Sequence, residues 1–378
     1  MEPYKIAIPD AVLEDLRRRL AQTRWPGQIQ SGWDAGTDRS YLKKLCDYWQ
    51  TGFDWRAQEK ALNRFAHFRT EIANLKIHYI HQRSTAPNAL PLVITHGWPG
   101  SIFEFTKIVG PLADPVAHGG RAEDAFHVVC PSLPGFGFSE PPRAPGFDVK
   151  KAAEVVVQLM ARLGYARYGA QGGDWGSSVA SWLGALDAGH VCGIHLNLVA
   201  GRPPEGVADP EAGLTAQEKQ YLAHRQEFLK YETGYREIQS TKPQTLGYGL
   251  NDSPVGLAGW IVEKFYTWTD CQGDLERRLT PDELLTNLTI YWATQTITSS
   301  MRLYYETRKT KNLIPERVEV PVGCAIFPRE IYNSPRPWAE NVYNIQRWTE
   351  MPAGGHFAAL EEPELLVEDL RAFYRPLR

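Results

Sequence analysis

The chain has 378 residues, about two to three times the length of a typical domain, so we expect one large domain or a domain with a substantial insertion. Its 43% hydrophobic and 22% charged residues are typical of a soluble globular protein. The 41 Lys and Arg nearly balance the 44 Asp and Glu, so the formal net charge of −3 gives no indication of a nucleic-acid or anionic-membrane partner. No apolar run reaches the roughly 20 residues that span a bilayer, and the first residues lack the order of a signal peptide.

The cysteines give no indication of a structural metal or of disulfides. They are five in number and far apart, and they form no cluster with zinc spacing. We therefore expect isolated thiols in a reducing compartment. The 12 Trp and 17 Tyr, by contrast, suit an apolar ligand pocket with polar handles. The cysteines are Cys46, Cys130, Cys192, Cys271 and Cys324.

Residues 1–72 are predicted to form a helical N-terminal extension. Residues 11–20 follow Pro9-Asp10 and carry apolar side chains at helical spacing. Residues 41–50 form a second amphipathic segment, with Ser40 as its expected cap. Four tryptophans predict that the extension is pinned onto a larger body: Trp25, Trp33, Trp49 and Trp55.

Residues 73–202 show the alternation of strands and helices that is typical of a mostly parallel sheet with helices on both faces. The segment 75–80 alternates like a half-buried strand, whereas 90–95 and 126–130 are continuous apolar runs, as in strands covered on both faces. Further strands are predicted at 165–170 and 194–199, and helices at 149–163 and 176–186.

The alternation stops at Gly201-Arg-Pro-Pro204, and residues 203–310 are predicted to form a helical lid. Residues 311–378 then complete the sheet, with strands at 322–327 and 345–351 and a closing helix at 363–374. An insertion placed after one strand and before the next covers the carboxyl ends of the strands, where α/β folds bind ligands. The fold class predicted is therefore an α/β fold with a helical lid and a helical extension.

One short motif has the form of a nucleophile elbow. Gly172-Gly-Asp-Trp-Gly176 lies between a predicted strand and a predicted helix, and it matches the Gly-x-nucleophile-x-Gly turn of α/β-hydrolases. The glycines are needed because the backbone doubles back sharply beside the exposed nucleophile. Gly-Asp pairs also make ordinary turns, but the position of this one favours Asp174 as a nucleophile.

An aspartate nucleophile implies a two-step reaction. A carboxylate is already ionised at neutral pH, so it attacks an sp³ carbon without a base and forms an alkyl ester. Water must then cleave that ester, and this step needs a base. His356, in Gly354-Gly-His-Phe357 after the last predicted strand, is the candidate. Glu330, in the loop after 322–327, is the favoured carboxylate to orient it, over Glu316 and Glu319, which precede the strand.

The second step also builds negative charge on the aspartyl carbonyl oxygen, which backbone N–H groups can stabilise. His96-Gly-Trp-Pro-Gly-Ser101 directly follows the strand 90–95 and has the glycine content of such a loop. We expect the backbone amides of Trp98 and Trp175 to be the donors. The His96 side chain itself is interpreted as a turn histidine bonded to the backbone.

With these residues in place, the sequence resembles the epoxide hydrolases that carry a helical N-terminal extension, the group containing the microsomal and juvenile-hormone enzymes. The similarity covers nearly the whole chain. It rests on several long motifs in the same order: Arg24-Trp-Pro26, His96-Gly-Trp-Pro-Gly-Ser101, Pro131-Ser-Leu-Pro-Gly-Phe-Gly-Phe-Ser139, Gly172-Gly-Asp-Trp-Gly176, Thr241-Lys-Pro243, Leu250-Asn-Asp-Ser-Pro-Val-Gly-Leu257 and Gly354-Gly-His-Phe-Ala-Ala-Leu-Glu361.

The resemblance implies two lid tyrosines that hydrogen-bond the epoxide oxygen, and the matching positions are Tyr235 and Tyr304. A phenol with a pKa of about 10 is a fitting donor to the alkoxide that ring opening creates. Tyr305 adjoins Tyr304 and is expected to point elsewhere on the helix. The resemblance also supports Glu330 as the acidic partner. It implies a small apolar epoxide and water as the reactants, with no cofactor and no metal.

The chain departs from the microsomal relatives, which begin with a hydrophobic membrane anchor. Because this sequence starts at the helical extension, we expect no membrane anchor and a cytoplasmic enzyme. Tryptophans exposed on the extension would suit the interface of a homodimer.

Two other functions fit part of the pattern. A haloalkane or haloacid dehalogenase also uses an elbow aspartate, and Asp174-Trp175 fits both reactions. A dehalogenase needs N–H donors for halide, whereas an epoxide needs O–H donors. A hydrolase-fold protein without activity is the second alternative, since a fold does not guarantee a reaction.

Overall fold

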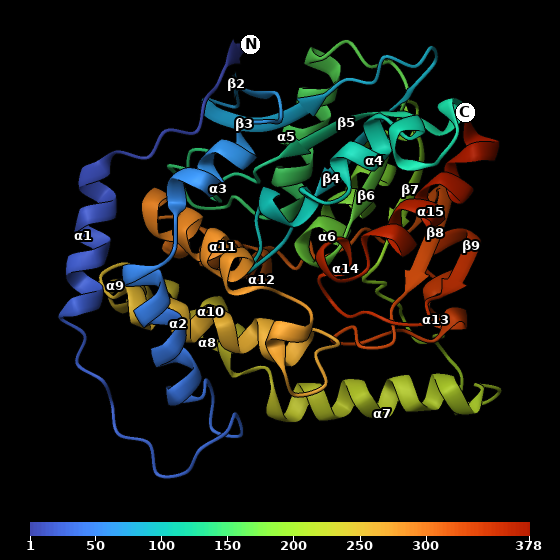
Figure 1. The fold of residues 1–378 in the computed structure, drawn as a ribbon. Helices are drawn as coiled ribbons and strands as arrows, with labels where there is room; N and C mark the ends of the chain where they lie inside the picture. Colours follow the sequence, from blue (N-terminus) through green and yellow to red (C-terminus); the bar gives the residue numbers. More distant parts are fainter.

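A nine-stranded sheet runs through the computed structural model, which describes residues 1–378 (Figure 1). The strand order is β1-β2-β3-β5-β4-β6-β7-β8-β9. The pairs β1–β2, β2–β3 and β3–β5 are antiparallel. The remaining pairs, from β5–β4 to β8–β9, are parallel. The mostly parallel sheet is thus confirmed. The strands are β1 (Glu2–Pro3), β2 (His67–Ile72), β3 (Leu75–Gln82), β4 (Leu90–Thr95), β5 (Phe126–Pro131), β6 (Tyr168–Gly172), β7 (Val191–Leu196), β8 (Val318–Ile326) and β9 (Tyr343–Glu350).

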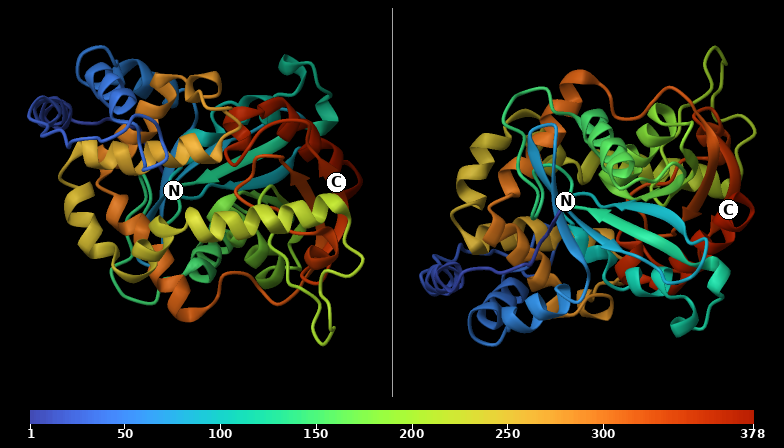
Figure 2. Two further views of the ribbon diagram at one scale, coloured as in Figure 1. Left: turned by 90° about the horizontal axis from the view of Figure 1, so that it is seen from below. Right: turned by 90° about the horizontal axis from the view of Figure 1, so that it is seen from above.

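Helices cover both faces of this sheet, as Figure 2 shows in two views. Helices α5 and α6 lie on one face, and α4 and α15 lie on the other. The central strands are buried on both sides, which explains their continuous apolar sequences. These helices, with the short ones near the C-terminus, are α4 (Val109–Ala113), α5 (Val149–Arg162), α6 (Asp174–Leu186), α13 (Arg336–Glu340), α14 (Ala358–Glu361) and α15 (Pro363–Tyr374).

The prediction of an all-helical segment up to about residue 70 is wrong at both ends. The chain begins with β1, and residues 67–72 form β2, which pairs with β3 as a hairpin. The hairpin turns at Ala73 and Asn74, whose φ angles are +52° and +59°. The turn residues are Ala-Asn and not the Asn-Gly pair that usually signals a hairpin, and alanine is rare in such a turn. The sequence therefore contains no sign of this hairpin. In between lie the expected helices α1 (Asp10–Ala21) and α2 (Arg39–Thr51), followed by α3 (Trp55–Leu62).

Several predicted boundaries also shift. Helix α2 is capped by Asp38, whose carboxylate accepts the Tyr41 N–H at 2.9 Å, rather than by Ser40. The predicted strand 165–170 begins three residues late, at Tyr168, and β7 begins at Val191 instead of residue 194. Helix α6 starts at Asp174 itself, two residues before the predicted start. Terminal residues of an element contribute little periodicity, so their assignment depends on caps and tertiary contacts.

Helices between β7 and β8 form the insertion at the carboxyl ends of the strands. They are drawn in yellow and orange in Figure 1, below and to the left of the sheet, with α7 along the lower edge. Contacts of α8 with α9 and α12, and of α10 with α9 and α11, join them into one unit. They are α7 (Ala216–Tyr231), α8 (Gly234–Thr241), α9 (Pro243–Leu250), α10 (Pro254–Trp268), α11 (Pro281–Thr294) and α12 (Ile297–Thr310).

The extension packs largely on this insertion. Trp49 is buried and donates its indole N–H to Thr289 of α11 at 2.9 Å. Trp33 stacks on Tyr266 of α10 with a centroid distance of 3.9 Å. Extension, sheet and insertion contribute to one hydrophobic core. The predicted pinning by tryptophans is therefore confirmed for these two rings.

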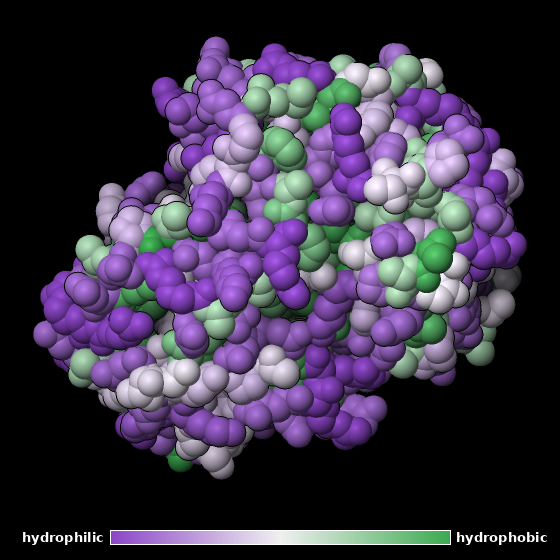
Figure 3. Space-filling model, turned by 45° about the horizontal axis from the view of Figure 1, so that its top comes forward, coloured by the Kyte–Doolittle hydropathy of each residue, from purple (hydrophilic) through white to green (hydrophobic).

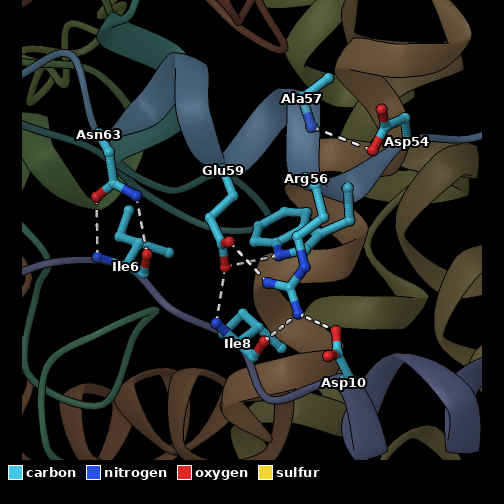
Figure 4. A network of polar contacts seen from close by, with 9 residues as sticks. Ile6, Ile8, Asp10, Asp54, Arg56, Ala57, Glu59 and Asn63 are labelled. Carbon is cyan, nitrogen blue, oxygen red and sulfur yellow. Dashed lines mark hydrogen bonds and ion pairs between the residues drawn. The ribbon is translucent and has the colours of Figure 1, made fainter.

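Polar contacts also hold the connection between β1 and α1 against helix α3 (Figure 4). Asn63 binds the backbone of Ile6 twice: its side-chain oxygen accepts the N–H at 2.9 Å, and its amide donates to the carbonyl at 2.8 Å. Glu59 accepts the Ile8 N–H at 2.7 Å, and Arg56 donates to the Ile8 carbonyl at 2.7 Å. The side chains of one short helix thus satisfy a strand-like segment that has no sheet partner.

The outer surface is mostly polar. In the face drawn in Figure 3, hydrophilic residues dominate, and apolar side chains show mainly in hollows between them. None of the helices combines the length and the apolar character that crossing a lipid bilayer requires.

Asn63→Ala should lower the stability of the protein. It removes both partners of the Ile6 backbone, and because Ile6 is fully buried, we expect a cost of about 1–3 kcal/mol in the free energy of unfolding. Chemical denaturation measures the change. Asn344→Ala is the matched control: Asn344 also makes two bonds, donating to the Glu319 carbonyl and accepting from the Gln346 amide, but both are exposed, so their loss should cost no more than about 0.5 kcal/mol. Equal stability of the two variants would contradict this assignment.

Candidate active site

Asp174 lies where the chain leaves β6 and enters α6. Its φ angle is +49°, a left-handed conformation that non-glycine residues seldom adopt. The turn is tight on both sides: a Cβ on residue 172 would lie 2.0 Å from the Gly176 carbonyl oxygen, and a Cβ on residue 176 would lie 1.8 Å from that of Thr95. Glycine is therefore required at both positions. Strained backbone of this kind is characteristic of functional sites.

Two groups bind the Asp174 carboxylate. The Trp98 backbone N–H donates to Oδ1 at 2.8 Å, and His356 Nε2 lies 3.3 Å from Oδ2. Gly97 leaves room for this contact, since a Cβ there would lie 2.0 Å from Oδ1. The Trp175 amide, the second predicted donor, makes no hydrogen bond with the carboxylate in this structure.

His356 is held between two carboxylates. Its Nδ1 is 2.5 Å from Glu330 Oε1, which also accepts the Ile331 N–H at 2.7 Å. The His356 backbone N–H donates to the Trp268 carbonyl at 2.9 Å, and the Trp268 ring packs edge-on against the imidazole. Glu330 comes from the loop after β8 and His356 from the loop after β9, so the two meet at the carboxyl edge of the sheet.

The charges in this group reinforce one another. Burial alone would lower the pKa of His356, but the carboxylates of Glu330 and Asp174 outweigh it and hold that pKa well above the ordinary value for histidine. At neutral pH the imidazole is therefore protonated and bridges the two carboxylates.

Tyr235 on α8 and Tyr304 on α12 face Asp174 from the insertion. Both are buried, and their rings lie 6.1 Å apart at 82°. The Trp98 ring stacks on Tyr235, and the Trp175 ring packs edge-on against Tyr304. Burial raises the pKa of both phenols, with the Asp174 charge adding to the rise, so both keep their protons at neutral pH. Tyr305 lies under the Lys309 ammonium instead, 4.1 Å away.

A cavity of 360 Å³ lies between the elbow and the insertion. Asp174, Trp175, Tyr235 and Tyr304 line it, together with apolar side chains such as Leu198 and Phe228. An apolar cavity with a few convergent polar groups is typical of a small-molecule site.

A second, much smaller cavity also borders Asp174. It measures 20 Å³ and is lined by Asp174, His356, Glu104, Gln171 and Asn197, among others. Asp174 is the one residue that lines both cavities. A substrate and a water molecule can thus approach the same carboxylate from different cavities.

The structure brings together five of the predicted side chains, Asp174, His356, Glu330, Tyr235 and Tyr304, and the Trp98 amide. His96 behaves as a turn residue, as predicted: its Nε2 accepts the Leu133 N–H at 3.2 Å. Sequence reasoning missed Glu104 and Tyr332, which line the small and the large cavity respectively. The sequence offered one signal for Glu104, which is an acidic residue three positions after the Gly-rich loop 96–101. It offered no signal for Tyr332.

No group of three or more His, Cys, Asp or Glu side chains in the structure has an arrangement that could hold a metal ion. The five cysteines are all unpaired.

Comparisons with known proteins show the family to which the chain belongs. Residues 1–105 match the family described as "Epoxide hydrolase N terminus", and residues 91–204 match "alpha/beta hydrolase fold". A putative epoxide hydrolase from Stigmatella aurantiaca is 47% identical over 100% of this chain and 85% of its own length. Epoxide hydrolase 1 from Sus scrofa is 41% identical over 99% of this chain and 88% of its own.

A solved structure leads to the same group. Juvenile hormone epoxide hydrolase from Bombyx mori superposes with a TM-score of 0.91 and 32% identity, over 100% of this chain and 94% of that one. The sheet, the elbow and these matches define an α/β-hydrolase. Within that class, the chain is an epoxide hydrolase of the group that carries the N-terminal domain. Microsomal and juvenile-hormone epoxide hydrolases are its homologues over the full length.

Gly97→Ala should abolish or strongly reduce epoxide hydrolysis while the protein stays folded. The added methyl group would occupy the position of Asp174 Oδ1 and displace the carboxylate from the Trp98 N–H. Losing one donor of this kind costs about 10²–10³ in kcat in other enzymes. Steady-state assays and circular dichroism measure the two effects. Gly189→Ala, where a Cβ meets nothing within 4 Å, is the control and should be fully active.

Proposed function

We propose that the chain hydrolyses epoxides to vicinal diols through a covalent ester on Asp174. The observation that carries this proposal is the position of the Asp174 carboxylate, which faces the large cavity with two phenols and also contacts His356 and the Trp98 amide. In the first step, one Asp174 oxygen attacks a ring carbon, and the bond from that carbon to the epoxide oxygen breaks. Because Oδ1 is held by the Trp98 N–H, Oδ2 is the attacking oxygen.

The phenols of Tyr235 and Tyr304 bind the epoxide oxygen, and one of them protonates it as the ring opens. Both phenols keep their protons at neutral pH, and both line the cavity opposite Asp174. The products of this step are a hydroxyalkyl ester and a tyrosinate. General acid catalysis of this type contributes about 10²–10⁴ to a rate.

In the second step, the tyrosinate first takes the proton of the His356 imidazolium, which restores the phenol and leaves His356 neutral. His356 then takes a proton from water, and the water oxygen bonds to the ester carbonyl carbon. The Trp98 N–H already donates to Oδ1, so it stabilises the negative charge that develops there. We propose that the Trp175 amide becomes a second donor at this stage. The ester C–O bond then breaks, the diol leaves with the proton from His356, and the remaining water proton passes from the Asp174 carboxyl to His356, which restores the starting charges.

Formation of the ester prepares His356 for this role. In the free enzyme, the Asp174 carboxylate is one of the two groups that raise the pKa of His356. Esterification removes the Asp174 charge, so the pKa of the imidazole falls, and the neutral form needed for a base becomes accessible. Glu330 keeps Nδ1 protonated and leaves Nε2 facing the water and the ester.

The cavity supports a small, largely apolar epoxide as the substrate. Its 360 Å³ are lined mainly by hydrophobic residues near Asp174, while polar and charged side chains such as Arg236 and Lys311 also line it. No cofactor takes part in the scheme, because each proton and bond is assigned to a side chain, the substrate or water.

We further propose a cytoplasmic enzyme, because five unpaired cysteines suit a reducing compartment. A homodimer through the extension is also proposed. The loop between α1 and α2 carries the fully exposed side chain of Ile29, and the half-buried rings of Trp25 and Trp33 are nearby in sequence. Cell fractionation and light scattering would test these two points.

Asp174→Ala and His356→Ala should separate the two steps. Asp174→Ala removes the nucleophile and should abolish ring opening altogether. His356→Ala should still open one equivalent of epoxide per active site and then stop, with the substrate bound as an ester. Intact-protein mass spectrometry after mixing with excess epoxide measures the adduct. Equal inactivity of both variants in a single-turnover assay would argue against the two-step scheme.

A haloalkane or haloacid dehalogenase is the second candidate, because the indole N–H groups of Trp98 and Trp175 are buried without partners and would suit a halide. The variant Tyr235→Phe with Tyr304→Phe distinguishes the two reactions. Epoxide hydrolysis should fall by at least about 10²-fold, because no O–H donor remains for the alkoxide. Halide release from a haloalkane by the wild-type enzyme would support dehalogenation as a second activity, and an unchanged rate of diol formation in the double variant would contradict the role of the two phenols. Tyr305→Phe is the control and should leave diol formation unchanged.

A further inference from the structure

The proposed mechanism does not use Glu104, an acidic residue that lines the same small cavity as Asp174 and His356. Glu104 belongs to the short 3₁₀ helix Ile102–Phe105, which follows the loop that carries Trp98. It is half-buried, and its side chain lines two internal spaces: the small cavity beside Asp174 and a second one that is too small to hold a water molecule. Gly100 makes room for the carboxyl: a Cβ there would lie 1.5 Å from Glu104 Oε1.

The first of these cavities has the size and the polarity of a site for one water molecule. Its volume is 20 Å³, and a single water needs about 10–15 Å³ and two to four polar partners. Glu104, His356 and Asp174 line it. Gln171 also lines it; its Nε2 donates to Asn197 at 2.8 Å, whereas its Oε1 is buried without a partner among the protein's own groups.

We propose that Glu104 binds the water molecule that cleaves the Asp174 ester. This inference rests on the proposed two-step function and assigns the second reactant a site of its own. Water in the small cavity and substrate in the large one would then occupy separate spaces that share Asp174 alone. Its first O–H bond breaks and the proton goes to His356 Nε2, while the oxygen bonds to the ester carbonyl carbon. Glu104 accepts the second O–H without taking the proton, and Gln171 Oε1 accepts a further contact that fixes the water's orientation.

The electrostatics of Glu104 fit a role that begins only after ring opening. Burial raises the pKa of Glu104 to about 8, the Asp174 carboxylate adds to the rise, and His356 opposes it. The carboxyl is therefore largely neutral in the free enzyme at pH 7. Esterification removes the Asp174 charge, which lets Glu104 ionise more readily as long as His356 keeps its proton, and an ionised Glu104 is the stronger hydrogen-bond acceptor for water. The other polar and titratable groups near it are Ser101, Lys107, Glu283, Asn287 and Tyr291.

Glu104→Gln tests the proposal, with the two steps measured separately. Rapid mixing with excess epoxide gives the rate of ester formation from the loss of tryptophan fluorescence or from the adduct mass after acid quenching. Single-turnover decay of the preformed ester gives the hydrolysis rate. We expect ester formation within about threefold of wild type, and ester hydrolysis slower by at least about 10-fold, so that the ester accumulates in the steady state.

The pH profile adds a readout that loss of packing would not change. In the wild-type enzyme, both His356 and Glu104 must lose a proton for hydrolysis, so the acid limb of log rate against pH approaches a slope of about two. In Glu104→Gln the slope should be about one. Glu283→Gln is the matched control: Glu283 borders Glu104 through the second small cavity and pairs with Lys107 at 2.8 Å, but it does not line the water-sized cavity. Both of its steps should match wild type.

The outcomes separate this proposal from the proposed function. If the wild-type enzyme forms no ester, the two-step function itself fails. If wild type forms the ester and Glu104→Gln hydrolyses it at the wild-type rate, only the role of Glu104 is overturned. Loss of both steps in Glu104→Gln would also overturn it, because a residue that binds water alone leaves ring opening intact.

Discussion

The site depends on keeping one carboxylate ionised inside the protein. Removing a carboxylate from water is costly unless hydrogen bonds and opposite charge compensate. For Asp174 the compensation comes from the Trp98 N–H and the protonated His356. Close approach of the Trp98 N–H explains Gly97, where a Cβ would meet the carboxylate, whereas Gly172 and Gly176 are required because a Cβ there would meet the backbone of the tight turn. The glycines around the elbow thus follow from the placement of one side chain.

The same carboxylate couples the two halves of the proposed reaction. As an anion, Asp174 raises the pKa of both His356 and Glu104. In the free enzyme His356 is therefore protonated, and Glu104 is largely protonated. As an ester it no longer does so: His356 loses its proton more easily, and so does Glu104 while His356 is still charged. The attack that consumes the first reactant therefore changes the groups that handle the second one. No movement of the backbone is required for this change, because all three residues already line the same small cavity.

Residue patterns alone predicted the parts of the structure that depend on local chemistry. The buried strand β4 and the closing helix α15 have the predicted bounds, because continuous apolar runs and a proline in the first turn are unambiguous signals. The elbow and the His356 loop could be found from glycine spacing. The hairpin of β2 could not, since Ala73 is an unusual turn residue. Tyr235 and Tyr304 required the family resemblance, because no local pattern separates them from 15 other tyrosines, out of 17 in the chain.

The N-terminal extension acts on the site through the insertion rather than by direct contact. Trp49 and Trp33 fix α11 and α10, and α10 ends at Trp268, whose carbonyl binds the His356 backbone N–H. Asn287 of α11 donates to the Pro99 carbonyl, and Tyr291 of α11 donates to the Gly100 carbonyl, so the same helix braces the loop that carries Trp98. An insertion held only by its two connections to the sheet would leave these contacts to weak local packing. The extension packs on the insertion and stabilises it. It thereby also stabilises the two loops that position the Trp98 amide and the His356 imidazole.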